Sequence, residues 1–132
     1  MRYAAVLVFL SLLPTGCATI ADQAKMEAFG QINDTYESAM RLSEFKTACQ
    51  FVDPSVMASD ACRKRYDNLK LTRYDVLEMA AAEDNQEIRQ TVELEYFFLD
   101  RYVVRKIQHH QLWRYREEMG AWLLQTGPPK FE

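Results

Sequence analysis

The chain has 132 residues, of which 48% are hydrophobic and 27% charged, with 16 basic against 19 acidic residues. This length suits one domain that is large enough to bury a single hydrophobic core. The formal net charge of −3 comes without a basic half or tail, so nucleic acid is not an expected partner.

Residues 1–16 have the pattern of an export signal. Arg2 supplies one positive charge, and residues 3–13 form an apolar run interrupted only by Ser11. A charged region followed by an apolar region is typical of a signal peptide. A membrane-spanning helix needs about 20 apolar residues, so this run is too short to span a bilayer. We expect residues 1–16 to target the chain and then to be removed.

The end of this segment, Leu13-Pro14-Thr15-Gly16-Cys17, resembles the lipobox that lipoprotein signal peptidase cuts. In that motif a small residue precedes a cysteine that receives diacylglycerol. Pro14 departs from the pattern, because the leucine stands one position earlier than usual. The resemblance implies that Cys17 carries the lipid, with palmitate-like acyl chains that hold a mature domain of residues 17–132 at a membrane.

The residue after the cysteine bears on the location. In Gram-negative lipoproteins an aspartate at this position resembles the signal for retention in the inner membrane, and this chain has Ala18. The outer membrane, with the domain facing the periplasm, is therefore the expected location. The alternative is ordinary signal peptidase cleavage, whose small-x-small requirement is met by residues 16–18, and which would release a soluble periplasmic protein.

Two further cysteines, Cys49 and Cys62, are the only thiols that remain once Cys17 is lipidated or removed. An even number of cysteines in an oxidising compartment favours a disulfide. It would close a short loop and stabilise the fold by about 3 kcal/mol. Two buried, reduced cysteines are the alternative. A metal site is not expected, since two cysteines without nearby histidines leave a zinc ion short of ligands.

The first half of the mature chain has helical patterns. Apolar residues recur at steps of three and four over residues 21–40, which predicts an amphipathic helix. Ser43 is a suitable N-cap for a second, short helix that ends where Asp53-Pro54 interrupts it. Ser59 could begin a third helix that ends near Asn68.

The pattern changes after residue 69. Residues 91–96 alternate apolar and charged side chains, which predicts a strand. Residues 102–116 are rich in β-formers, and residues 117–120 can form a turn into 121–126. The resulting hairpin pairs Trp113 with Leu124 and Tyr115 with Trp122.

These elements predict an α+β fold in which N-terminal helices pack on a curved antiparallel sheet. An all-α bundle is the alternative, because several apolar residues of the second half also fall at helical spacing. These residues are Ile88, Val92, Tyr96, Leu99, Val103 and Ile107, followed by His110.

The closing segments resemble a known family. Residues 105–115 (RKIQHHQLWRY), 120–124 (GAWLL) and 129–131 (PKF) look like the last strands of small proteobacterial lipoproteins with an NTF2-like, cystatin-like α+β domain. Residues 36–54 resemble the helix, turn and second helix that precede the sheet in that family. The resemblance implies a cone-shaped sheet that serves as a ligand pocket, an enzyme site or merely a core, and fold does not choose among these.

Four side chains are candidates to line such a pocket: Tyr96, His109, Gln111 and Trp113. The last three share one face of their strand. His110 points to the opposite face, so the two adjacent histidines cannot readily bind one metal ion. A core histidine with satisfied hydrogen bonds is a more common role for His109 than general-base catalysis.

No catalytic motif is present, and neither an enzymatic activity nor a cofactor is expected. The leading hypothesis is a lipid-anchored, non-catalytic binding or scaffolding module for envelope proteins. A small-molecule-binding or enzymatic NTF2-like pocket is the second hypothesis. A pilotin-like accessory lipoprotein of a secretion system is the third, and it depends on the all-helical alternative.

Overall fold

A computed structural model describes the backbone of residues 16–132 and the side chains from Ile20 onward. The predicted signal peptide, residues 1–16, therefore falls almost entirely outside the described residues, and so does the side chain of Cys17. Among the helices that the structure describes, none combines the length and the apolar character needed to cross a bilayer.

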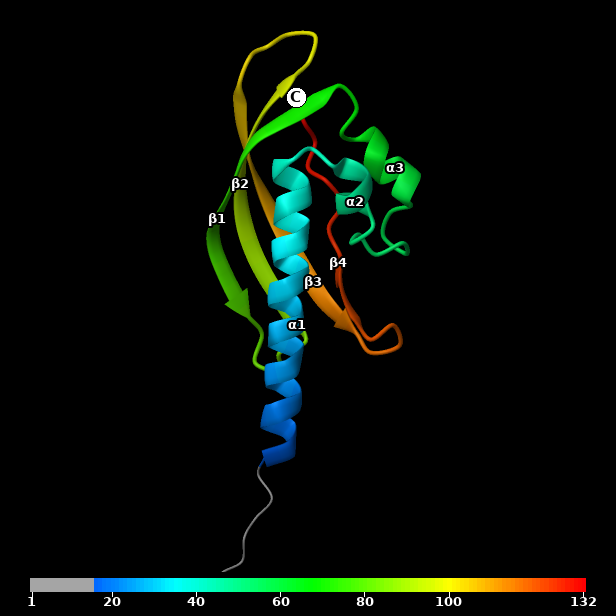
Figure 1. Cartoon of the computed structure of the whole chain (residues 1–132), viewed down its shortest axis with the longest axis vertical. Helices are drawn as coiled ribbons and strands as arrows, with labels where there is room; N and C mark the ends of the chain where they lie inside the picture. The colour runs from blue at the N-terminus through cyan, green and yellow to red at the C-terminus, as the bar shows by residue number, and fades with distance from the viewer. Residues whose placement is uncertain (1–15) are drawn as a thin grey trace, which may run out of the picture.

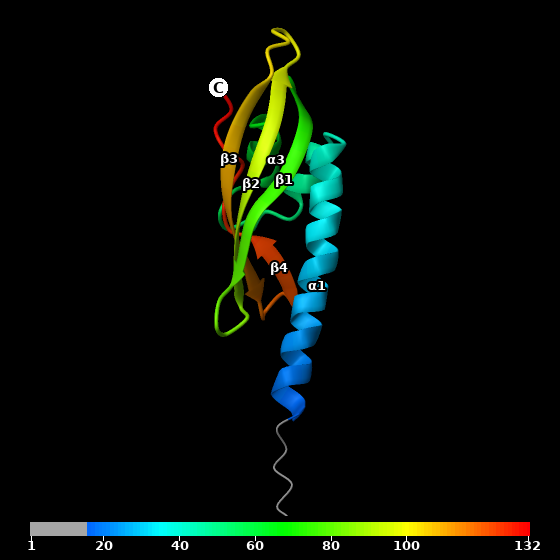
Figure 2. The ribbon, with the colours of Figure 1, turned by 90° about the vertical axis from the view of Figure 1, so that its left-hand side faces the viewer.

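The chain forms three helices and then a sheet of four antiparallel strands in the order β1-β2-β3-β4 (Figure 1). The long helix α1 lies along one face of the sheet (Figure 2). The α+β prediction is confirmed and the all-α alternative is wrong. Residues of β2 alternate between buried and less buried positions, as in a strand, so the helical spacing of apolar residues in this half is coincidental. The elements are α1 (Gly16–Arg41), α2 (Phe45–Cys49), α3 (Ser59–Lys64), β1 (Leu69–Ala81), β2 (Glu87–Phe98), β3 (Arg105–Arg116) and β4 (Ala121–Leu124).

Helix α1 is amphipathic as predicted, but it begins at Gly16 rather than near residue 21. Its second half supplies the buried contacts, through Phe29, Tyr36, Ala39 and Met40. Its first turns run past the end of the sheet (Figure 1). The helix therefore packs through its C-terminal part and projects at its N-terminal part.

The predicted N-cap of α2 is wrong. Ser43 has a left-handed backbone (φ 57°), and the N-cap position is Glu44, without a side-chain hydrogen bond. The Ser43 hydroxyl instead accepts a hydrogen bond from the Leu71 N–H at 3.1 Å, so it joins the end of α1 to β1. Helix α3 begins at the predicted Ser59 and ends earlier than expected, at Lys64.

The β3–β4 hairpin has the predicted register, with Trp113 opposite Leu124 and Tyr115 opposite Trp122. Its turn closes at Gly120, whose φ of 58° is a conformation that glycine adopts without strain. β4 ends at Leu124, two residues before the predicted end of the strand.

The core lies between α1 and the inner face of the sheet. Trp113 is fully buried, and its ring meets those of Phe29 and Tyr36 at centroid distances of 5.8 and 5.2 Å. Phe29 also packs edge-on against Trp122 at 5.3 Å. Aromatic side chains of α1 thus fill the concave side of the sheet.

Candidate functional site: a buried amide network and an exposed apolar loop

A network of polar side chains lies inside this core, centred on Gln111 of β3. The Gln111 Nε2 group donates to the Tyr74 hydroxyl and to His109 Nδ1, both at 3.2 Å. Its Oε1 accepts from Gln90 Nε2 at 2.7 Å and from Trp113 Nε1 at 3.1 Å. An amide side chain offers two donor hydrogens and about two acceptor positions, so Gln111 is fully bonded.

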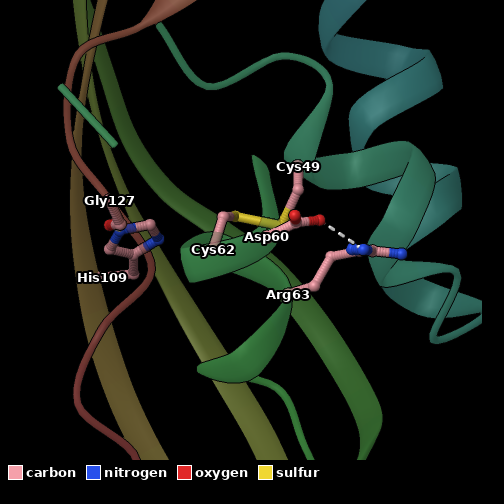
Figure 3. The surroundings of a disulfide bond; sticks show 6 residues. All are labelled: Cys49, Asp60, Cys62, Arg63, His109 and Gly127. Atoms are coloured by element: carbon pink, nitrogen blue, oxygen red, sulfur yellow. Dashed lines mark hydrogen bonds and ion pairs between the residues drawn. A yellow bond between two sulfur atoms is a disulfide. The ribbon is translucent and has the colours of Figure 1, made fainter. Parts of the chain in front are cut away.

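The contacts of His109 define its tautomer. Nε2 lies 2.9 Å from the Gly127 carbonyl oxygen, which can only accept, so Nε2 carries the hydrogen. Nδ1 then accepts from Gln111. Burial lowers the pKa of His109 to about 4, with the Gly127 contact opposing the shift. The ring is therefore neutral at ordinary pH and holds the C-terminal segment against β3 (Figure 3).

The network reaches α1 through Gln90. The Gln90 Nε2 group donates to Asn33 Oδ1 at 3.0 Å as well as to Gln111. Gln90 Oε1 is buried without a partner among the described residues. One donor group thus serves two acceptors, and the amide ties helix to sheet.

The four predicted pocket residues do not form one group. His109, Gln111 and Trp113 are brought together and are buried. Tyr96 is buried elsewhere, where its hydroxyl donates to the Glu132 carbonyl oxygen at 2.9 Å. The ring of Tyr96 packs against Phe131 at 4.9 Å.

Sequence reasoning missed three members of the network: Asn33, Tyr74 and Gln90. Gln90 was within reach, because extending the alternation of residues 91–96 backward by two positions from Val92 places it on the inner face. Tyr74 was not, since irregular pairing of β1 near residues 71–73 breaks the period of two. Asn33 requires knowledge of which face of α1 meets the sheet.

A second polar cluster lies at the α2–α3 loop and is centred on Asp53. Asp53 is buried and bonds to the Ser55 amide and hydroxyl at 2.9 and 2.7 Å. It also accepts from Gln125 at 3.0 Å and pairs with Arg116. Hydrogen bonds from Ser55, aided by Gln125 and Arg116, lower the pKa of Asp53 to about 2. This carboxylate therefore fastens the loop to the β3–β4 hairpin.

The disulfide lies beside that loop. Cys49 of α2 and Cys62 of α3 are bonded, with their Cα atoms 5.8 Å apart (Figure 3). Both cysteines are buried. The predicted pairing is thus present, and it holds the two short helices together.

The groups just described do not form a recognisable reaction centre. The side-chain nitrogen and oxygen of Gln111 are hydrogen-bonded to other residues of the core. Both ring nitrogens of the neutral His109 are hydrogen-bonded as well. Within residues 16–132, no three His, Cys, Asp or Glu side chains cluster as metal ligands would. These hydrogen bonds hold the helix, the sheet and the C-terminal segment together.

The β2–β3 connection has the opposite character. Its apolar side chains point to solvent, with Tyr102 76% exposed and Leu99, Val103 and Val104 each about half exposed. The Tyr102 backbone is left-handed (φ 52°). Beside this loop, a groove is lined by Tyr96, Val103, Arg105, Lys106, Ile107, Lys130 and Glu132. Several exposed apolar residues in one loop are typical of an interaction surface.

The loop and the start of α1 lie at opposite ends of the molecule (Figures 1 and 2).

The fold places the protein in the class of α+β domains, with one long helix on an open antiparallel sheet. No protein-family model, curated protein or solved structure matches the chain.

Proposed function

We propose that the protein is an outer-membrane lipoprotein with an NTF2-like domain, which acts as a non-catalytic binding or scaffolding module for an envelope protein. Anchoring through Cys17 would place the membrane at the N-terminal end of α1. The observation that carries the binding role is the exposed apolar loop of residues 99–104 at the far end of the domain. An anchored domain would present this loop toward the periplasm.

The composition of the core supports a binding role over a reaction. The inner face of the sheet is occupied by the rings of Phe29, Tyr36 and Trp113. His109 is held neutral and bonded on both sides, so it lacks a free nitrogen to act on a substrate. The pilotin-like hypothesis loses the helical bundle on which it depended.

The anchor is tested by mass spectrometry of protein extracted from membranes in detergent without reductant. We expect a chain that begins at Cys17, carries acyl chains and is lighter by the two hydrogens lost in the Cys49–Cys62 disulfide. An unacylated chain that begins elsewhere would contradict the anchor. Mass that is lost on denaturation would instead favour the small-molecule pocket.

The binding surface is tested by photo-crosslinking in intact cells. A photoreactive amino acid is placed at Val103 of the loop and, as the matched control, at Gln108, which is exposed on β3. We expect a discrete adduct with one envelope protein from position 103 and none from position 108. Equal labelling from both positions, or none from 103, would exclude the loop as the docking surface.

A further inference from the structure

The two edges of the sheet are protected differently. β4 has only four residues, and the chain before α3 covers it: the Asp53 N–H donates to the Leu124 carbonyl at 2.9 Å, and the Leu124 N–H to the Phe51 carbonyl at 2.8 Å. β1 has 13 residues and, within the described part of the chain, pairs only with β2. The free edge of the sheet is therefore the outer side of β1.

The end of α1 covers the first part of this edge. Ser43 accepts from the Leu71 N–H, and the Arg41 guanidinium donates to the Tyr74 carbonyl at 2.6 Å. From residue 76 to residue 81, no hydrogen bond from another described residue reaches β1 except those from β2. The later part of β1 lies at the sheet margin, away from the short helices (Figure 1).

This uncovered part is apolar. It reads Val76-Leu77-Glu78-Met79-Ala80-Ala81, and Leu77 and Met79 are 49% and 58% exposed. Natural edge strands are commonly protected by lysine, proline or a short length. Residues 76–81 contain no lysine or proline, and the protections are one glutamate and an irregularity at Leu77. Such an edge is a template for another strand.

We infer that residues 76–81 pair antiparallel with the same residues of a second copy, so that two sheets join across a two-fold axis. This isologous arrangement uses one patch twice. Its partner is therefore a strand whose apolar side chains and length match those of β1 itself. The inference is independent of the proposed function, because it involves neither the anchor nor the β2–β3 loop.

Charge favours this direction of pairing. Exposed Lys70 and Arg73 stand at the beginning of β1, and exposed Glu83 and Asp84 follow its end. Antiparallel pairing brings the basic end of each copy beside the acidic turn of the other, whereas parallel pairing would place like charges together. A register with Met79 opposite Met79 of the second copy places Glu78 opposite Ala80, so the two Glu78 carboxylates do not face each other.

The test is the mass of the full chain in density-matched detergent, measured by sedimentation equilibrium. We expect a dimer at micromolar concentration. Leu77→Lys should weaken it by at least about tenfold, since an edge lysine opposes strand pairing. Leu42→Lys is the control, because Leu42 is also an exposed leucine, in the loop after α1, and its replacement should leave the dimer unchanged. Circular dichroism verifies that both variants are folded.

A charge exchange tests the direction of the strands. Asp84→Arg and Arg73→Asp should each weaken the dimer, and the double variant should restore it, because the basic and acidic ends are then swapped. A monomer at all concentrations would overturn the inference. So would a dimer that Leu77→Lys leaves intact, since it would form through another surface.

Discussion

Gln111 determines how the polar interior is arranged, because four buried groups depend on its one amide. They are the Tyr74 hydroxyl, His109 Nδ1, Gln90 Nε2 and Trp113 Nε1. Replacing a buried partner leaves the groups that it bonded without a hydrogen bond, and each unpaired group lowers the free energy of unfolding by about 1–3 kcal/mol.

Gln111→Leu should therefore lower the free energy of unfolding by about 2–4 kcal/mol, measured by urea denaturation. Gln108→Leu is the control, since Gln108 is an exposed glutamine on the same strand. We expect it to change the unfolding free energy by less than about 0.5 kcal/mol. Equal effects of the two substitutions would mean that the network adds nothing to stability.

His109 predicts a pH dependence of stability. Its pKa is lowered to about 4 in the folded protein, against about 6.5 for a histidine in an unfolded chain. Between these values the unfolded chain binds a proton that the folded protein does not, so stability falls as the pH drops from 6.5 toward 4. The total loss is about 3 kcal/mol. Above pH 6.5 this contribution does not change.

Urea titrations at several pH values test this prediction. His109→Gln should flatten the dependence in that window, and His110→Gln should keep it, because His110 is exposed. Asp53 does not interfere, since its pKa is lowered to about 2. Its contribution is present above pH 4 and is lost between about 4 and 2. A slope that persists in His109→Gln would assign the effect to another group.

At the scale of elements, the disulfide compensates for the shortness of α2 and α3. These helices have five and six residues, too few for either to be stable alone. The Cys49–Cys62 bond spans 13 positions of sequence and fixes them to each other. Asp53 lies within the closed loop and fastens it to the hairpin.

Replacing both cysteines with alanine should lower the free energy of unfolding by about 3 kcal/mol, because the unfolded chain regains the entropy of an open loop of this length. Thermal unfolding with and without reductant measures the effect. The wild type should shift to a lower Tm on reduction, while the double variant should not respond. A reductant-insensitive wild type would show that the bond contributes no stability.

The elements also show which parts of the structure were readable in advance. The strand at residues 91–96, the Trp113–Leu124 register and the Cys49–Cys62 pairing follow from local pattern or from cysteine number. β1 did not follow, because its two irregularities with β2, at residues 71–73 and 76–78, spoil the alternation. The role of Ser43 was missed because its partner, Leu71, is 28 positions away. In the buried network, Asn33 and Tyr74 were out of reach of local pattern, whereas Gln90 was not.

The whole molecule is organised around one core that α1 shares with the sheet. Phe29 of α1 meets both tryptophans, and Asn33 bonds to Gln90 of β2. Helix and sheet therefore lack separate interiors. Unfolding should be a single cooperative event rather than a loss of the helix followed by the sheet.

Urea unfolding followed by two probes tests this expectation. Tryptophan fluorescence reports on Trp113 and Trp122 in the sheet, and circular dichroism at the helical minimum is dominated by α1. The two curves should have the same midpoint and slope. An earlier loss of helical signal would mean that α1 is only loosely held by the sheet.

The amide network has a further consequence, which concerns how the chain finds its fold. Neighbouring residues of a strand face opposite sides, so a slip of β3 by one residue would turn Gln111 and Trp113 outward and Arg114 inward. Hydrophobic side chains alone tolerate such errors better than hydrogen bonds do, because an amide accepts only partners at the right distance and angle. Gln111 therefore favours one alignment of the strands: a misaligned sheet would leave its amide and the groups that it bonds without partners, whereas the native sheet pairs them.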